Sequence, residues 1–118
     1  MAKSGVTIYH NPKCQTTRTV LGFLREAGIE PVIVEYLKTP PARAELKRLI
    51  KGMGARPRDV LRWKEGMAKE LQLDPEKSSD DALLDAMMEH PILINRPIVV
   101  TEKAVRLCRP SESVKELL

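Results

Sequence analysis

The stretch VTIYHNPKCQTTRTVLGFLREAGIEPVIVEY, residues 6–36, decides the fold because its hydrophobic period changes twice. Residues 6–10 are rich in β-branched and aromatic side chains and predict a strand. From Gln15, apolar residues recur every three or four positions, which predicts a helix that ends at about Gly28. Residues 31–36 predict a second strand. A β-α-β unit with short loops indicates that its two strands are parallel.

The chain becomes helical over residues 41–90, after a pair of prolines. Apolar residues recur there at helical spacing, and Ser79 or Asp80 can cap the last segment. The predicted segments are a helix that ends at Gly54, a short turn at Arg58–Trp63, and helices over residues 67–73 and 80–89.

Extended structure returns after the helical block. Residues 98–101 predict a strand, and residues 104–108 predict its hairpin partner across a tight turn at Glu102 and Lys103. A final helix is expected after Pro110.

This order of elements places a parallel half and an antiparallel half in one sheet. We therefore predict an α/β fold with a thioredoxin-like mixed four-stranded sheet and a helical insertion between strands 2 and 3. The length of 118 residues fits a single domain, 1–118, with the insertion at about residues 41–90.

Composition and charge exclude several classes of protein. The apolar fraction of 42% and the charged fraction of 31% are ordinary for a globular chain. Aromatic residues make up only 3%, which argues against a stacking platform for single-stranded nucleic acid. Residues 38–69 hold ten basic and three acidic residues, either as solvated helix faces or as a basic lobe that faces an anion. No nucleic-acid motif accompanies this charge, so we expect no nucleic-acid partner.

The sequence also predicts where the protein works. No apolar stretch approaches the ~20 residues that a membrane helix needs, and Met1–Gly5 lacks the apolar core of a signal peptide. We therefore expect a cytoplasmic protein with no membrane partner. Its two cysteines lie far apart in the sequence, which fits neither a disulfide framework nor a zinc site. No metal is expected.

Cys14 is the strongest candidate for chemistry. It stands at the start of the first predicted helix, where free N–H groups and the helix dipole favour a thiolate. The same N–H groups can cradle an oxyanion. His10, Lys13 and Arg18 add positive charge nearby. The alternative is a buried cysteine that only fills a gap.

A second thiol is not adjacent to Cys14. A thioredoxin-type motif would place a cysteine at position 17, which Thr17 occupies instead. An outside thiol or a distant one must therefore resolve Cys14. We expect the Thr17 hydroxyl to donate to the thiolate, to cap the helix, or to do both, and Thr17 is a candidate substrate-binding residue. Cys108, near the end of the last strand, is interpreted as a packed core thiol and not a resolving cysteine.

Three arginines are candidates for oxyanion binding, namely Arg62, Arg96 and Arg109. Arginine supplies planar pairs of donors that match an oxyanion. Pro97 is a candidate cis proline before the third strand, which would bring Arg96 close to Cys14. Arg109 ends the neighbouring strand. The alternative for each arginine is a solvated surface side chain.

Three segments together resemble the ArsC family of glutaredoxin-coupled arsenate reductases. They are Tyr9–Cys14 with Arg18 four residues later, His90–Thr101, and Arg106–Glu112. The resemblance covers nearly the whole chain in order. One departure is Thr17, because many members of the family carry serine there.

The resemblance implies an activity and its residues. The nucleophile would be Cys14, the active-site histidine His10, and the oxyanion-binding arginines Arg62, Arg96 and Arg109. Arsenate would be reduced to arsenite in arsenical resistance, with glutathione as co-substrate, glutaredoxin as partner and no bound cofactor. Two alternatives stay open: a related glutathione-dependent thiol reductase with another substrate, and an Spx-like redox regulator that binds RNA polymerase. Many of those regulators carry a Cys-x-x-Cys switch, which this chain lacks.

Overall fold

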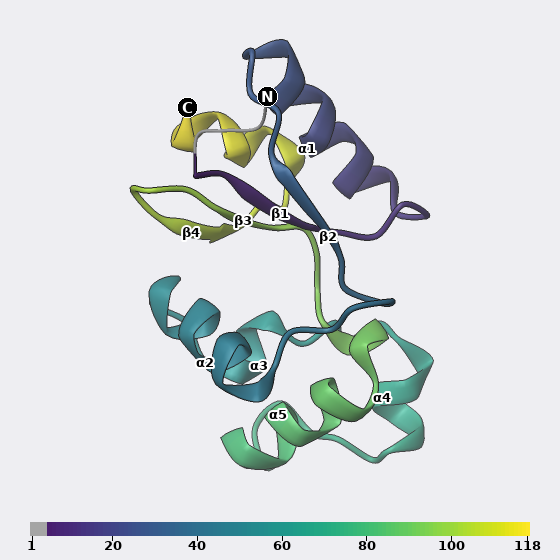
Figure 1. The fold of residues 1–118 in the computed structure, drawn as a ribbon. Coiled ribbons are helices and arrows are strands. Elements are labelled where there is room, and N and C mark those ends of the chain that lie inside the picture. Colours follow the sequence, from purple (N-terminus) through teal and green to yellow (C-terminus); the bar gives the residue numbers. More distant parts are fainter. Residues whose placement is uncertain (1–4) are drawn as a thin grey trace. The chain divides into compact units, whose positions relative to one another are not determined.

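The computed structural model describes residues 5–118 as two compact units (Figure 1). The first unit runs up to Thr39 and resumes at Arg96–Leu118, and the second unit is Pro40–Asn95. The second unit corresponds to the predicted helical block. That the whole chain is one domain stays a prediction, and the signal-peptide expectation for Met1–Gly5 falls mostly on residues outside those described.

The first unit is built on a mixed sheet. Its strands are β1 (Thr7–His10), β2 (Val32–Glu35), β3 (Ile98–Val100) and β4 (Val105–Leu107). The spatial order is β2-β1-β3-β4, with β1 parallel to β2 and the other neighbours antiparallel. The predicted four-stranded sheet with a parallel and an antiparallel half is confirmed.

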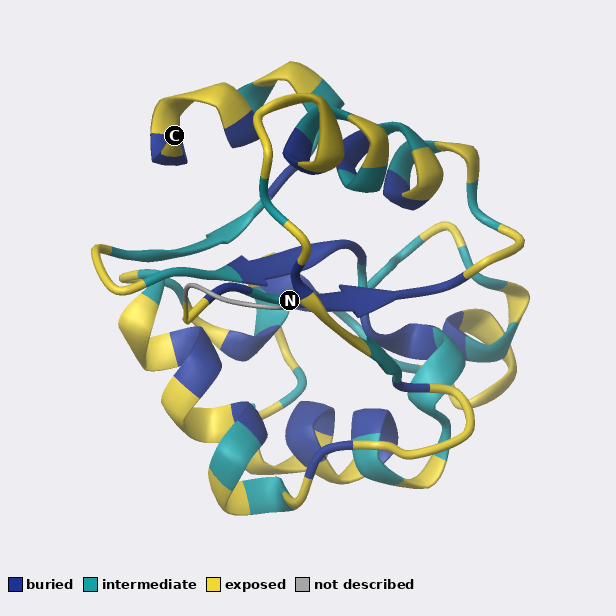
Figure 2. Ribbon diagram, turned by 45° about the horizontal axis from the view of Figure 1, so that its top comes forward, coloured by how far each residue is buried: buried dark blue, intermediate teal, exposed yellow. Residues whose placement is uncertain are grey.

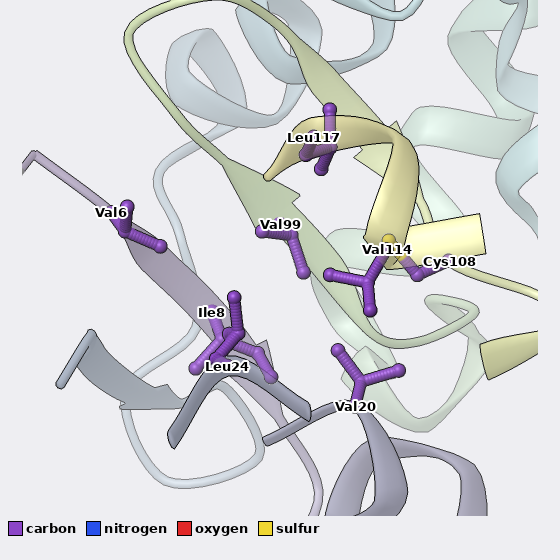
Figure 3. Close-up of a cluster of buried hydrophobic side chains, with 8 residues drawn as sticks. All are labelled: Val6, Ile8, Val20, Leu24, Val99, Cys108, Val114 and Leu117. Carbon is purple, nitrogen blue, oxygen red and sulfur yellow. The ribbon is translucent and has the colours of Figure 1, made fainter. Parts of the chain in front are cut away.

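Helix α1 (Gln15–Glu26) and the 3₁₀ helix η2 (Ser111–Leu117) pack together on one face of this sheet. Figure 3 shows the shared core, in which side chains of α1 and η2 meet side chains of β1 and β3. Full burial of a valine or leucine contributes about 1.5–3 kcal/mol each, so this layer holds α1 against β1. The buried cluster is Val6, Ile8, Val20, Leu24, Val99, Cys108, Val114 and Leu117.

The end of α1 agrees with its sequence signal. Gly28 adopts a φ of 81°, in the left-handed region that glycine tolerates. Its N–H donates to the Arg25 carbonyl oxygen, and the Ile29 N–H donates to the Leu24 carbonyl oxygen. This pairing of the last helical carbonyls stops the helix and starts the chain toward β2.

The second unit is helical. Helix α5 (Asp80–Glu89) packs against two other helices of the unit and against the 3₁₀ segment Pro91–Leu93. Figure 2 shows helices with one buried and one exposed side. The predicted cap is confirmed, since the Ser79 Oγ accepts a hydrogen bond from the Ala82 N–H over 3.1 Å. The elements are α2 (Arg43–Gly52), α3 (Pro57–Val60), α4 (Gly66–Glu70), α5 (Asp80–Glu89) and η1 (Pro91–Leu93).

Three local predictions need correction. Pro57–Val60 forms one turn of helix, earlier than the predicted turn, because proline suits the first helical position. Helix α4 ends at Glu70, whereas the prediction extended it to residue 73. Gln72, two residues after this end, has a φ of 59°, which a helix does not allow. The last helix is 3₁₀ and not α, and the Ser113 N–H bonds three residues back to the Pro110 carbonyl oxygen.

Within residues 5–118, no helix combines the length and apolar character that a membrane crossing requires.

Candidate active site

Cys14 stands at the junction between β1 and α1. It is the N-cap of α1, with extended backbone dihedrals, and its carbonyl oxygen accepts the first helical bond from the Arg18 N–H at 3.2 Å. The preceding turn is closed twice by Asn11. The Asn11 carbonyl oxygen accepts from the Cys14 N–H at 2.9 Å, and its Oδ1 accepts from the Lys13 N–H at 3.0 Å. Short polar side chains close turns in this way.

The surroundings of Cys14 favour its thiolate. Burial alone would raise the pKa of Cys14, but hydrogen bonding from the Thr17 N–H, the Arg96 and Arg109 side chains and the Thr16 N–H lowers it to about 7. Nη1 of Arg109 lies 3.9 Å from the Cys14 Sγ. The sulfur is half-buried. The lowered pKa favours the thiolate, which is the nucleophilic form, near neutral pH.

The two arginines are fixed to each other. Nη1 of Arg109 donates to the Arg96 carbonyl oxygen over 2.7 Å, and Arg96 is only 7% exposed. The peptide bond between Arg96 and Pro97, which the sequence marked only as a candidate, is cis. The structure thus brings Arg96 and Arg109 to Cys14, where their guanidinium groups can meet an oxyanion.

Thr17 is placed differently from its prediction. Its hydroxyl donates to the Asn11 carbonyl oxygen at 2.5 Å and lies 3.0 Å from the Cys14 carbonyl oxygen, so it does not donate to the thiolate. A threonine hydroxyl in the first helical turn reaches back toward such carbonyls. The Thr17 side chain is fully buried. That Thr17 belongs to the substrate-binding residues stays a prediction.

His10 does not add a positive charge at neutral pH, contrary to expectation. Burial is the main cause that lowers the pKa of His10, and Arg25 and Arg18 lower it further. Glu35 on the neighbouring strand acts in the opposite direction, but the net effect is a lowered pKa. The side chain is 7% exposed, and its Nδ1 has no hydrogen-bond partner among residues 5–118. A role for His10 in the chemistry stays a prediction.

Arg18 and Lys13 flank the same turn. Arg18 Nη1 donates to the Pro12 carbonyl oxygen over 2.8 Å, and its Nη2 donates to the Gln15 side chain over 2.9 Å. Arg18 therefore braces the turn from outside. Lys13 is exposed.

Cys108 is a core residue, as predicted. It is fully buried between the sheet, α1 and η2. Burial raises its pKa to about 11, against smaller opposing effects of Ser113 and Arg106. A protonated, enclosed thiol is unsuited to resolve Cys14.

Arg62 belongs to the second unit. Its Nε pairs with Glu65 at 3.2 Å, and its Nη1 donates to the Asn95 Oδ1 at 3.4 Å. Its assignment to oxyanion binding stays a prediction.

Tyr36 and Asn11 are parts of the site that the sequence reasoning missed. Tyr36 follows β2 directly and is 1% exposed. Its phenol oxygen accepts hydrogen bonds from the side chains of Asn11 and Arg96. The parallel pairing of β1 and β2 could have pointed to Tyr36. It sets Glu35 beside His10, so Tyr36, the residue after Glu35, comes to lie at the turn that carries Cys14.

Across residues 5–118, no group of three or more metal-ligating side chains is present.

Comparisons with known proteins agree with this geometry. The profile of the ArsC family matches residues 9–117. An arsenate reductase of Rhizobium meliloti (strain 1021) is 56% identical over 113 residues, which cover 96% of this chain and 81% of that protein. An arsenate reductase of Escherichia coli (strain K12) is 54% identical over 115 residues, which cover 98% of this chain and 82% of that protein.

The structural comparison gives the same fold. The structure of an arsenate reductase from Vibrio cholerae superposes with a TM-score of 0.92 at 49% identity, and covers 100% of both chains. The structure of a putative arsenate reductase from Yersinia pestis superposes with a TM-score of 0.88 at 46% identity, and covers 94% of this chain and 98% of that chain. The predicted thioredoxin-like α/β fold is therefore confirmed.

Proposed function

The chain belongs to the ArsC family, and we propose that it is an arsenate reductase whose nucleophile is Cys14. The observation that carries the proposal is the half-buried Cys14 sulfur, held at the start of α1 beside Arg96 and Arg109. A thiolate next to two guanidinium groups is a nucleophile and an oxyanion site in one place.

The first step joins sulfur to arsenic. The Cys14 thiolate attacks the arsenic of arsenate, an S–As bond forms, and one arsenate oxygen leaves as water after protonation. Arg96 and Arg109 bind the remaining oxygens and stabilise the charge that develops on them. The Thr16 and Thr17 N–H groups, which stabilise the free thiolate, are freed when the sulfur becomes neutral. Arg62 and His10 are proposed as further members of this site on the family resemblance.

The second step transfers two electrons. The thiolate of glutathione attacks the Cys14 sulfur, an S–S bond forms, and the S–As bond breaks with its electron pair left on arsenic. Arsenic(V) thereby becomes arsenite, while the two sulfurs are oxidised to a mixed disulfide. A glutaredoxin thiolate then attacks the glutathione sulfur and releases Cys14 as a thiolate. An external thiol is required because Cys108 is enclosed in the core.

Glutathione and glutaredoxin belong to a reducing compartment, and we propose that the protein acts in the cytoplasm. Both cysteines are free thiols, which supports this assignment.

The experiment is a coupled assay of arsenate-dependent NADPH oxidation with glutathione, glutaredoxin and glutathione reductase. Wild type should turn over, Cys14→Ser should not, and Cys108→Ala, which changes the other cysteine, should retain turnover. Absence of arsenate turnover in a folded wild type with a reactive Cys14 would overturn the proposal in favour of a related thiol reductase. Saturable binding to RNA polymerase without turnover would favour an Spx-like regulator.

A further inference from the structure

Arg96 is the only buried arginine among residues 5–118, and only 7% of its surface is exposed. A buried guanidinium is costly unless hydrogen-bond acceptors hold it. The identity of those acceptors therefore decides how much of its charge remains for an incoming anion. Arg96 hydrogen-bonds both the Cys14 sulfur and the phenol oxygen of Tyr36.

Tyr36 is itself held in place by the cysteine turn. Asn11 is 4% exposed, and its Oδ1 is engaged by the Lys13 N–H at 3.0 Å. Its NH₂ group is therefore directed to the Tyr36 phenol oxygen, to which it donates. The same turn that carries Cys14 thus fixes the acceptor of Arg96.

The chemical nature of this acceptor matters. Burial raises the pKa of Tyr36, so the phenol is neutral at neutral pH, although Arg96 acts in the opposite direction. A carboxylate in the same position would neutralise the guanidinium and compete with the oxyanion for it. A neutral phenol oxygen orients the guanidinium and leaves its positive charge available.

We propose that Tyr36 is a positioning residue for Arg96: its hydroxyl oxygen, backed by Asn11, holds the guanidinium at the Cys14 sulfur so that the full charge of Arg96 meets the oxyanion. The inference rests on the proposed function for the identity of the anion. The positioning itself concerns Cys14 and Arg96 alone and has a readout that needs no turnover.

The test is a double-mutant cycle with Tyr36→Phe and Arg96→Met. The pH dependence of Cys14 alkylation by iodoacetamide, followed by peptide mapping, gives the thiol pKa. The arsenate concentration that halves the alkylation rate gives oxyanion affinity. Loss of the phenol contact should raise the pKa of Cys14 by about 0.5 and weaken arsenate protection by about 3–10-fold. In turnover, KM for arsenate should rise more than kcat falls.

In the Arg96→Met background, Tyr36→Phe should change neither quantity further, because Tyr36 acts through Arg96. Thr7→Val removes a hydroxyl at the opposite end of β1 and should leave both quantities as in wild type. Circular dichroism and thermal melts establish that each variant is folded. An unchanged pKa and protection in Tyr36→Phe, or equal effects of Tyr36→Phe with and without Arg96, would overturn the proposal. Coupling without arsenate turnover would refute only the reductase function.

Discussion

Nη1 of Arg109 lies 3.9 Å from the Sγ of Cys14, although 95 positions separate the two residues in the chain. The order of the strands in the sheet brings these two residues together. Cys14 follows β1, and Arg109 follows β4, with β3 between these strands. The same Arg109 nitrogen donates to the Arg96 carbonyl oxygen at 2.7 Å, so one guanidinium joins the cysteine turn to the segment before β3.

Removal of Arg109 should weaken both the thiolate and oxyanion binding. Charge-assisted hydrogen bonds contribute about 1.5–3 kcal/mol, so Arg109→Ala should lower kcat/KM for arsenate roughly 10–100-fold and raise the pKa of Cys14. The matched control is Arg106→Ala, which removes an arginine of β4 that pairs with Glu116 at 2.6 Å. If the control loses as much activity as Arg109→Ala, the contact at Cys14 has no special role.

The reactivity of Cys14 should follow its lowered pKa. Because the thiolate is the nucleophile, the alkylation rate of Cys14 should rise with pH, reach half its maximum near pH 7, and level off about one pH value higher. Rapid-quench alkylation with peptide mapping measures this profile for each cysteine. Cys108 should stay unreactive in the folded protein, and a Cys14 midpoint near 9 would contradict the described surroundings.

The same pKa predicts a pH-dependent stability. The pKa of Cys14 is about 7 when folded and about 9 without these surroundings, so the folded state favours the thiolate. Its stabilising contribution is fully present above pH 9 and is lost as the pH falls through 7. As the pH rises from 7 to 9, the free energy of unfolding of the wild type should therefore increase relative to that of Cys14→Ser. Urea denaturation of both proteins checks the sign, and a difference that shrinks with rising pH would refute it.

Thr17 should matter chiefly through its buried hydroxyl. Thr17→Val leaves the Asn11 and Cys14 carbonyl oxygens without this donor, at a cost of about 1–3 kcal/mol in stability. Thr17→Ser keeps the donor and should lose less, even though it gives up a methyl group. Greater destabilisation by Thr17→Ser than by Thr17→Val in urea would show that the methyl, and not the hydroxyl, holds the turn.

The core that supports the site should behave as a packed layer. Leu24 of α1 is fully buried against the sheet, and Leu24→Ala should cost roughly 2–5 kcal/mol. Leu118→Ala, at a leucine that is 48% exposed, is the matched control and should change stability little. Guanidinium denaturation measures both, and a cost of less than about 1 kcal/mol for Leu24→Ala would contradict the packing.

Sequence patterns predicted the local elements well where a short signal sets the geometry. The strand-to-helix change before Cys14, the stop at Gly28 and the cap at Ser79 are each encoded within a few residues. The early end of α4 was not predicted because it depends on the left-handed conformation of Gln72, which carries no glycine signal.

The sequence predicted the main residues of the candidate site but not the residues that hold them in place. Cys14 was found because it lies at a helix start, and Arg96 and Arg109 because both precede prolines at strand ends. Tyr36 and Asn11 were missed, since their hydrogen bonds depend on the pairing of β1 with β2 and on burial. The Thr17 hydroxyl was assigned the thiolate as one possible acceptor, whereas it reaches back to the carbonyl oxygens of Asn11 and Cys14, as hydroxyls in the first turn of a helix do.

In the proposed reaction, Cys14 reduces arsenate together with an external thiol. The most direct measurement is peptide mapping by mass spectrometry after incubation with arsenate and glutathione, with glutaredoxin omitted. We expect a glutathione mixed disulfide on Cys14 that forms with arsenate, in step with released arsenite, and does not form with glutathione alone. Arsenite released without modification of Cys14, or a mixed disulfide that forms equally without arsenate, would contradict it.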